Sequence, residues 1–236
     1  MRTDVGVPLL AREPGPVRLP LPVREDVELW LVRTGEPPAA AEVAVLDAAE
    51  RRRAAAIRRP AQAALYVSAH AALRRLLGER LGVLPEDVPL RREAGGRPVV
   101  AGQAAVHFSL SHSGGLALVG LAGRPVGVDV QLVPGVTTAE LCGRRLHPAE
   151  RAELAARPPA DRAEGFARLW VRKEAYLKGL GTGLRRALDA DYLGDGGPGG
   201  PGRPAGWTVL DVPCAPGHAA AVALADLPGA AAPAAA

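Results

Sequence analysis

Asp129 and Gln131 are of residue types suited to metal and phosphate chemistry. Both lie in the run VGVDVQ, at positions 126–131, in which valines alternate with other residues. Successive side chains of a strand point to opposite faces, so Asp129 and Gln131 share one face while the three valines occupy the other. A carboxylate and an amide oxygen on a rigid strand can bind a hard cation such as Mg²⁺, which takes one or two carboxylates together with phosphate oxygens. An ordinary acidic residue on the solvent face of a strand is the alternative interpretation.

A second set of chemical groups lies in the run RLWVRKEAYLKGLGTGL, at residues 168–184. Trp170, Glu174 and Lys178 are spaced four residues apart, so on a helix they form one stripe, with Lys173 beside it. A tryptophan in the core would hold this stripe and let the carboxylate and the ammonium project from its edge. The alternative is a surface Glu–Lys pair that contributes roughly 0.3–0.5 kcal/mol.

Lysine is rare in this chain, because only Lys173 and Lys178 are lysines among the 29 basic residues. Both lie within six residues of each other, which suggests that a compact ammonium group matters in this segment. Gly179, Gly181 and Gly183 follow the predicted helix instead of opening one after a strand. They therefore indicate a helix end, not a dinucleotide-binding turn.

A third candidate is HFSLSHSGG, at residues 107–115, where a strand ends with Ser111 and His112 before a glycine turn. Backbone amides and the imidazole of such a turn could face an anion. A Ser-His catalytic dyad is excluded, because neighbouring strand residues point to opposite faces and no G-x-S-x-G elbow is present. A hairpin with a polar tip remains the alternative.

The elements that position these groups follow from hydrophobic periodicity. The pattern predicts a strand over 27–34, helical structure over 46–81 with a break at Pro60, and an antiparallel meander over 99–131. Residues 137–157 and 161–180 return to helical spacing, and the first of these stretches contains an N-cap at His147. Two strands then begin at Trp207 and His218. A flexible loop at 194–206 separates the last helix from these strands.

A turn near Gly123 divides the chain into two α+β halves, residues 1–123 and 124–227, followed by a disordered Ala/Pro tail at 228–236. The 236 residues suffice for one large domain or two small ones, and no apolar run approaches the roughly 20 residues that span a bilayer. The N-terminus does not resemble a secretory signal, so we expect a cytoplasmic protein. Cys142 and Cys214 lack the spacing of a disulfide framework or a zinc site. The net charge of +4 permits an anionic partner.

Together, these segments resemble the surfactin-type (Sfp-like) 4′-phosphopantetheinyl transferases, whose motifs read G-[KR]-P, S-H-S at a strand end, G-[IV]-D-[IV]-E and W-x-x-K-E-[AS]-x-x-K. The matching residues here are Gly96-Arg97-Pro98, Ser111-His112-Ser113, Gly127 through Gln131, and Trp170 through Lys178. Order and spacing agree, and the likeness extends from about residue 27 to residue 224. The KEA form is similar to the branch that often serves polyketide and nonribosomal peptide synthases, and hence antibiotic biosynthesis.

The resemblance implies a fold and a set of site residues. The fold is α+β, with two similar halves that form a pseudo-dimer within a monomer, each a small antiparallel sheet packed with helices. The implied metal ligands, for Mg²⁺ or Mn²⁺, are Asp129 and Glu174, with Gln131 weak or acting through water. The implied coenzyme A contacts are Arg53, Arg97, Pro98, Ser111, His112 and Lys178. Arg53 has a serious alternative as part of a solvated helix face, because other arginines crowd around it.

The resemblance also implies a reaction. A serine of an apo acyl or peptidyl carrier protein, which presents an acidic helix, attacks the β-phosphorus of coenzyme A. Phosphopantetheine is transferred to this serine and 3′,5′-ADP is released. The implied catalytic residues are Asp129, Glu174 as the base, directly or through a metal-bound water, and Lys178 at the departing phosphate.

Gln131 departs from the family pattern, which has an acid at this position. An amide is a weaker metal ligand and cannot act as a base, so a catalytically impaired relative that still binds coenzyme A or carrier protein is one alternative. A basic nucleic-acid-binding module is another. Against it, aromatic residues make up only 3% of the chain, which leaves little for base stacking, and no groove-reading motif is present.

Overall fold

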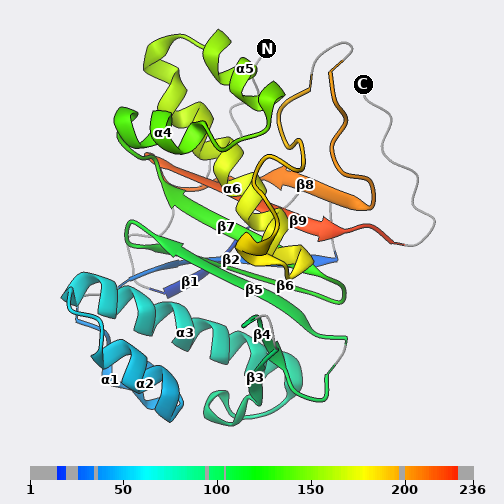
Figure 1. The fold of residues 1–236 in the computed structure, drawn as a ribbon. Coiled ribbons are helices and arrows are strands. Elements are labelled where there is room, and N and C mark those ends of the chain that lie inside the picture. The colour runs from blue at the N-terminus through cyan, green and yellow to red at the C-terminus, as the bar shows by residue number, and fades with distance from the viewer. Residues whose placement is uncertain are drawn as a thin grey trace.

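Two antiparallel sheets, packed face to face and each covered by one long helix, form the body of the molecule (Figure 1). The computed structural model describes residues 15–19, 26–34, 37–93, 96–103, 105–196 and 200–227. The strands are β1 (Gly15–Leu19), β2 (Val27–Arg33), β3 (Leu90–Arg92), β4 (Pro98–Val100), β5 (His107–Ser113), β6 (Leu116–Ala122), β7 (Val126–Leu132), β8 (Trp207–Asp211) and β9 (His218–Ala225). The helices are α1 (Ala40–Ala44), α2 (Ala48–Ala55), α3 (Pro60–Leu81), α4 (Val136–Gly143), α5 (Pro148–Ala156) and α6 (Arg162–Leu180).

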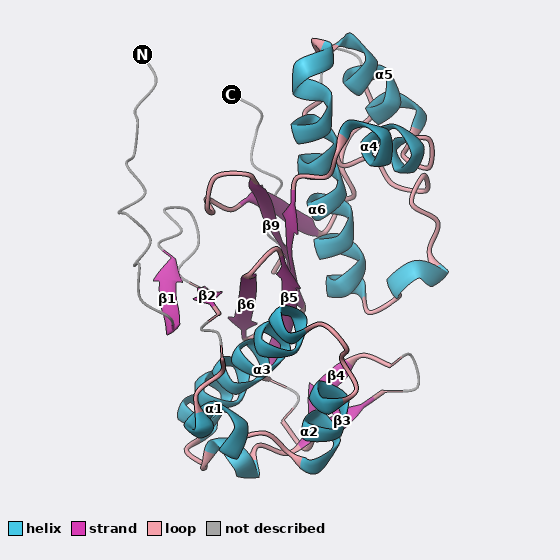
Figure 2. Cartoon of the chain, turned by 90° about the vertical axis from the view of Figure 1, so that its left-hand side faces the viewer, coloured by secondary structure: helices cyan, strands magenta, loops and turns pink. Residues whose placement is uncertain are grey.

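The strand order separates the two sheets. The first sheet runs β1-β2-β6-β5, the second runs β7-β9-β8, and β3 and β4 form a small hairpin. Helix α3 lies below the first sheet and α6 lies beside the second (Figure 2). None of the helices in the described ranges is long and apolar enough to cross a membrane.

Strand alternation builds the core between these layers. In β6, Leu116 and Leu118 face the second sheet, whereas Ala117 and Val119 face α3, so every residue of this strand is buried. In β9 the larger side chains face the first sheet, while Ala219, Ala221 and Ala223 face α6. Small side chains on that face allow the helix to lie close to the sheet.

The predicted meander is correct for β5 and β6, which pair antiparallel, but wrong for β7, which pairs with β9 in the other sheet. Strands β5 and β7 still lie side by side. The backbone amide of Val128 donates to the Ser109 hydroxyl at 3.0 Å, and that of Leu132 donates to the Ser113 hydroxyl at 3.1 Å. Serine hydroxyls on alternate positions of β5 thus take the place of a backbone ladder between the two sheets.

Most predicted elements lie close to their expected positions. The strand predicted over 27–34 is β2, and the break at Pro60 starts α3. His147 is the N-cap of α5, where it shares a capping box with Glu150. No pattern in the sequence predicted β1, α1 or the β3–β4 hairpin. The turn near Gly123 falls between β6 and β7, but the division into two similar halves stays a prediction, and residues 228–236 lie outside the described residues.

A buried arginine fixes the helices under the first sheet. Arg74 of α3 is only 1% exposed, and its guanidinium donates to the carboxylates of Glu50 at 2.5 Å and Asp47 at 2.6 Å. The same guanidinium also donates to three backbone carbonyls at residues 85–88. These contacts join α2, α3 and the turn that follows α3. Loss of one partner would leave an unpaired charge buried, which is costly, so the contacts stabilise these elements only when all of them are made.

We expect Arg74→Met to lower the free energy of unfolding by about 3–5 kcal/mol, because it leaves the Glu50 carboxylate without its guanidinium partner and three backbone carbonyls without their donor. Urea unfolding followed by circular dichroism measures this loss. Arg75→Met is the matched control, since Arg75 makes one exposed bond to a carbonyl, and should cost less than about 1 kcal/mol. Equal losses in the two variants would contradict this role for Arg74.

Candidate active site

The site begins where α6 lies against β7 with almost no space between the two backbones. A Cβ atom added at Gly127 would fall 1.9 Å from the carbonyl oxygen of Ala175 and 2.4 Å from the amide nitrogen of Gly179. Only a glycine on the strand permits this approach. The contact sets the register of the helix against the strand and decides which side chains of α6 meet those of β7.

The register places Lys178 of α6 against Asp129 of β7. The Lys178 ammonium lies 2.6 Å from the Asp129 carboxylate and 3.2 Å from the carbonyl oxygen of Val128. Ser111 of β5 donates its hydroxyl hydrogen to the same Asp129 oxygen at 2.6 Å. Asp129 is 5% exposed, so a carboxylate that would be costly to bury alone is held by two donors from two other elements.

Glu174 lies one helical turn before Lys178 and is half-buried. Burial raises the pKa of Glu174, the negative charge of Asp129 raises it further, and Lys178 partly opposes both effects. The two acids are therefore close enough to repel each other, and such a pair of carboxylates fits a divalent cation. Gln131, two residues beyond Asp129 on β7, is also half-buried.

No group of three or more histidine, cysteine or acidic side chains suited to a metal occurs among the described residues. A cation between Asp129 and Glu174 would therefore take its other ligands from water or from substrate oxygens. Mg²⁺ is commonly bound in this way, through one or two carboxylates together with phosphate.

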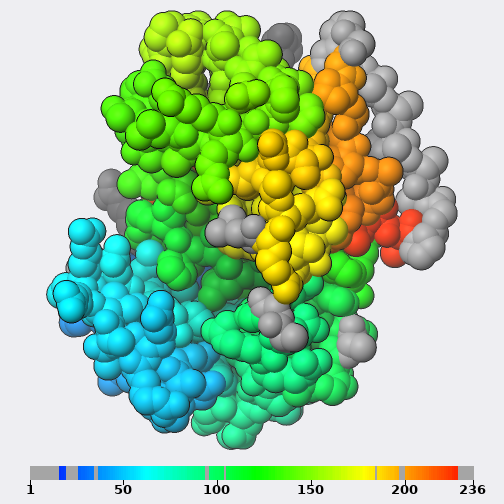
Figure 3. All heavy atoms as spheres, in the orientation of Figure 1, coloured from blue at the N-terminus to red at the C-terminus, as the bar shows by residue number. Residues whose placement is uncertain are grey.

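A basic cavity opens beside this cluster. It has a volume of about 380 Å³ and includes Lys178, Arg97, Pro98 and His112 in its lining. A second cavity, of about 460 Å³, adjoins it, because His70, Arg92, Pro98, Phe108 and Leu110 line both. Figure 3 shows the hollow between the cyan-to-green first part of the chain and the yellow end of α6.

The predicted coenzyme A contacts are distributed along these two cavities. Arg97 lines the first cavity and also donates to the carbonyl oxygen of Gly179 at 3.2 Å, which ties the β3–β4 hairpin to the end of α6. Pro98 lines both cavities, and Arg53 is exposed on α2 and lines the second. The hydroxyl of Ser111 instead lies on Asp129.

His112 lies at the edge of the first cavity, and its side chain points away from that of Ser111, as strand alternation predicts. Partial burial lowers the pKa of the His112 imidazole, and the positive charges of His70 and Lys178 lower it further. The imidazole is thus one of several cationic or potentially cationic groups that converge on one cavity. Such a concentration of positive charge suits a polyanionic ligand.

The two lysines have different partners. Lys173 is 2% exposed and pairs with the fully buried Glu150 at 2.9 Å, while it also donates to the carbonyl of Asp191 at 2.6 Å. It ties α6 to α5 and to the loop after α6. Only Lys178 reaches the cavity. Trp170 is half-buried and packs near Phe166, with their ring centroids 5.6 Å apart.

Sequence reasoning missed three groups at the cavities, namely His70, Arg91 and Arg92. His70 is a single histidine on a helix whose other residues are mostly apolar, and the two arginines belong to a strand of three residues. No local spacing marks these residues, because their partners come from segments distant in the sequence.

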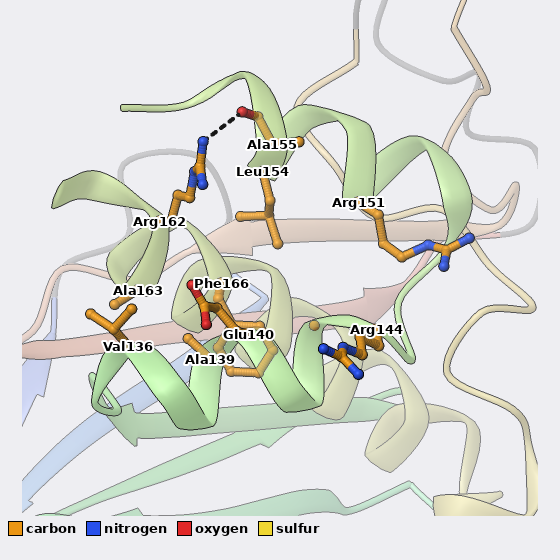
Figure 4. Close-up of a pocket in the computed structure, with 11 residues that line it drawn as sticks. Val136, Ala139, Glu140, Arg144, Arg151, Leu154, Ala155, Arg162, Ala163 and Phe166 are labelled. Atoms are coloured by element: carbon orange, nitrogen blue, oxygen red, sulfur yellow. Dashed lines mark hydrogen bonds between the residues drawn. The ribbon is translucent and has the colours of Figure 1, made fainter. Parts of the chain in front are cut away.

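A different hollow, of about 210 Å³, lies among α4, α5 and α6 (Figure 4). Its lining is mainly apolar and includes Ala139, Leu154 and Phe166, with arginines at the edge. Arg162 there donates to the backbone carbonyl of Ala155 at 3.1 Å. None of the predicted site residues lines this groove.

Comparisons with known proteins agree with the family resemblance. Residues 125–194 match the model of the 4′-phosphopantetheinyl transferase superfamily. The 4′-phosphopantetheinyl transferase HetI of Nostoc sp. is 30% identical over 180 residues, which cover 73% of this chain and 76% of HetI. A putative 4′-phosphopantetheinyl transferase of Synechocystis sp. is 30% identical over 69% of this chain and 68% of its own length. Sfp of Bacillus subtilis is 27% identical over 44% of this chain and 46% of its own length.

We expect Gly127→Ala to destabilise the protein by about 3 kcal/mol and to disturb the site, because its methyl group would overlap the backbone of α6. Thermal unfolding measures the first effect, and the affinity for coenzyme A measures the second. Gly123→Ala is the matched control, since its nearest neighbour would be 4.0 Å away, and should change neither quantity measurably. A Gly127→Ala protein with unchanged stability would show that the close contact is not required.

Proposed function

The chain belongs to the 4′-phosphopantetheinyl transferase superfamily, and from this membership we propose that it transfers the phosphopantetheine arm of coenzyme A to a serine of an apo carrier protein. The observation that carries the proposal is the meeting of Asp129, Glu174 and Lys178 beside a basic cavity. A transferase that acts on a diphosphate needs both features, because the substrate is polyanionic and more negative charge develops as the phosphate departs.

In this proposal Asp129 and Glu174 hold the divalent cation, Mg²⁺ or Mn²⁺, and Gln131 contributes at most through a water molecule. When bound, the cation neutralises negative charge on the diphosphate of coenzyme A. The donor set supports this assignment, since the repulsion between the two acids that raises the pKa of Glu174 is relieved by a cation between them.

The chain's own residues handle the proton and the departing phosphate. A carboxylate oxygen of Glu174 accepts the proton of the carrier serine. The serine oxygen forms a bond to the β-phosphorus as the bridging P–O bond breaks, and 3′,5′-ADP leaves. The Lys178 ammonium stabilises the charge on that departing group, while Ser111 keeps Asp129 oriented through its hydrogen bond.

The nucleotide end of coenzyme A then occupies the two adjoining cavities, near Arg97, Pro98, His112 and Arg53. We place the boundary between the two halves near Gly123, so that the ligand binds between residues of both. Action as a cytoplasmic monomer on polyketide, nonribosomal peptide or fatty-acid synthase carriers belongs to the same proposal. Nucleic acid has no role in it.

Incubation with an apo carrier protein, coenzyme A and Mg²⁺ tests the activity directly. We expect intact mass measurement to show the gain of one phosphopantetheine group on the carrier, and EDTA to abolish that gain. Carriers from fatty-acid, polyketide and peptide synthases should be tried in parallel. Binding of coenzyme A without modification of any carrier would instead identify a catalytically impaired relative.

We expect Asp129→Ala to lower the rate of transfer by about 10²-fold or more, because it removes the proposed metal ligand and the partner of Lys178. Gln131→Ala should lose much less activity, since an amide is a weak ligand for Mg²⁺. Rates measured during a Mg²⁺ titration of both variants, with thermal unfolding as the check on folding, provide the comparison. Equal losses would show that the ligand assignment is wrong.

A further inference from the structure

The Lys178 ammonium lies beside the two acids that are proposed to hold the divalent cation. Its nitrogen is 2.6 Å from Oδ1 of Asp129. Glu174 precedes Lys178 by four residues on α6, so their side chains are neighbours on one face of the helix. The proposed role of Lys178 at the departing phosphate does not account for its contact with Asp129, which places a monovalent cation next to the metal position.

A divalent cation at Asp129 would be close to this ammonium. Ser111 donates to the same oxygen, Oδ1, at 2.6 Å, so this oxygen has two donors. A cation at Oδ1 would have to displace the ammonium, and a cation at Oδ2 would share the carboxylate with it. Both arrangements cost free energy, because Asp129 is buried and little water screens the repulsion between the positive charges.

The neutral side chain of Gln131 leaves little negative charge to offset this repulsion. The ionised carboxylates of Asp129 and Glu174 carry two negative charges, and Lys178 cancels one of them. Gln131, on the same face of β7 as Asp129, adds none. A group of three or more histidine, cysteine or acidic side chains suited to a metal is absent from the described parts of the chain. The chain by itself therefore offers a divalent cation only a weak site.

The Lys178 side chain is free to exchange Asp129 for another anion. It is 31% exposed, it lines the first cavity, and its four-carbon stem is flexible. The other lysine of α6 differs, because Lys173 and its partner Glu150 are both buried and lie outside the two basic cavities. Ser111 is also buried, so its short side chain can keep Asp129 oriented when the ammonium moves.

We propose that Lys178 competes with the divalent cation for Asp129, and that coenzyme A opens the site to the cation by drawing the ammonium to its diphosphate. The inference rests on the proposed function, because it takes coenzyme A as the ligand. A diphosphate offers oxygens to both positive groups, so its negative charge offsets their repulsion. Coenzyme A therefore raises the affinity for the cation, and by thermodynamic linkage the cation raises the affinity for coenzyme A by the same factor.

Binding of Mn²⁺ tests this coupling without any turnover. The electron paramagnetic resonance signal of free Mn²⁺ gives the affinity of the full chain, first alone and then with saturating coenzyme A, in the absence of a carrier protein. A titration of Mn²⁺ with coenzyme A alone corrects for complexes that form in solution. We expect the unmodified chain to bind Mn²⁺ about tenfold or more tightly when coenzyme A is present.

We expect Lys178→Met to bind Mn²⁺ about fivefold more tightly than the unmodified chain when coenzyme A is absent, because no ammonium competes for Asp129. Coenzyme A should then raise the Mn²⁺ affinity by a smaller factor than in the unmodified chain. The matched control is Arg186→Met, which also removes one positive charge. Arg186 pairs with Asp191 at 2.8 Å outside both cavities, so its loss should change the Mn²⁺ affinity less than about twofold.

A second variant tests the part that charge plays. Gln131→Glu adds a carboxylate on the face of β7 that carries Asp129, and it should raise the Mn²⁺ affinity of the chain without coenzyme A by about tenfold. Gln131→Ala, which adds no charge, should change this affinity less than about twofold. Both Lys178→Met and Gln131→Glu are expected to gain affinity, which a misfolded protein would not do, and thermal unfolding verifies that each variant is folded.

An unchanged or lower Mn²⁺ affinity of Lys178→Met without coenzyme A would overturn the inference, because Lys178 would then not compete with the cation. Equal Mn²⁺ affinity of the unmodified chain with and without coenzyme A would overturn it too, as would the absence of any gain in Gln131→Glu. These results leave the proposed transfer intact, since mass measurement on a carrier protein tests it separately. Failure of the unmodified chain to bind coenzyme A would instead contradict the proposed function, and the inference would fail with it.

Discussion

The contact between the backbones of α6 and β7 at Gly127 is the constraint on which the site depends. Side chains usually keep a helix about 10 Å from a sheet, and at that distance Lys178 and Asp129 would be separated. The glycine on the strand and the alanines of β9 that face α6 remove this spacing. Small residues on this face of the sheet thereby allow the Lys178 ammonium of α6 to lie 2.6 Å from the Asp129 carboxylate of β7.

The close contact also brings two carboxylates, those of Asp129 and Glu174, near each other, and a bound cation would relieve their repulsion. Asp129 is buried with two donors, whereas Glu174 is half-buried beside it, and the negative charge of Asp129 adds to burial in raising the pKa of Glu174. When two carboxylates lie this close together, ionisation of both is unfavourable unless a cation lies between them. The same arrangement is therefore suited to a divalent cation.

Local sequence patterns predicted secondary structure, which depends on neighbouring residues. They did not predict contacts between residues that are distant in the sequence. Periodicity found α6 and the alternation of β7, and the motif order pointed to Asp129, Glu174 and Lys178. It could not show that Lys173 and Lys178, five residues apart and so turned by about 140° on a helix, face a buried glutamate and a cavity respectively. The sequence pattern also led to the wrong sheet for β7. The serines of β5 resemble the polar face of an ordinary strand, so nothing indicated that their hydroxyls replace backbone pairing between β5 and β7.

Strand β5 joins the basic cavity to the pair of acids, Asp129 and Glu174, through successive residues. Ser109 and Ser113 accept hydrogen bonds from the backbone of β7, Ser111 donates to Asp129, and His112 lines the cavity on the opposite face. A hydroxyl can both satisfy a buried amide and fit between closely spaced strands, whereas alanine would leave each amide of β7 without a partner. The serines of this strand therefore do more than hold a hairpin tip. Because they fix β7 relative to β5, they also fix the distance between Asp129, the proposed metal ligand on β7, and the cavity residue His112 on β5.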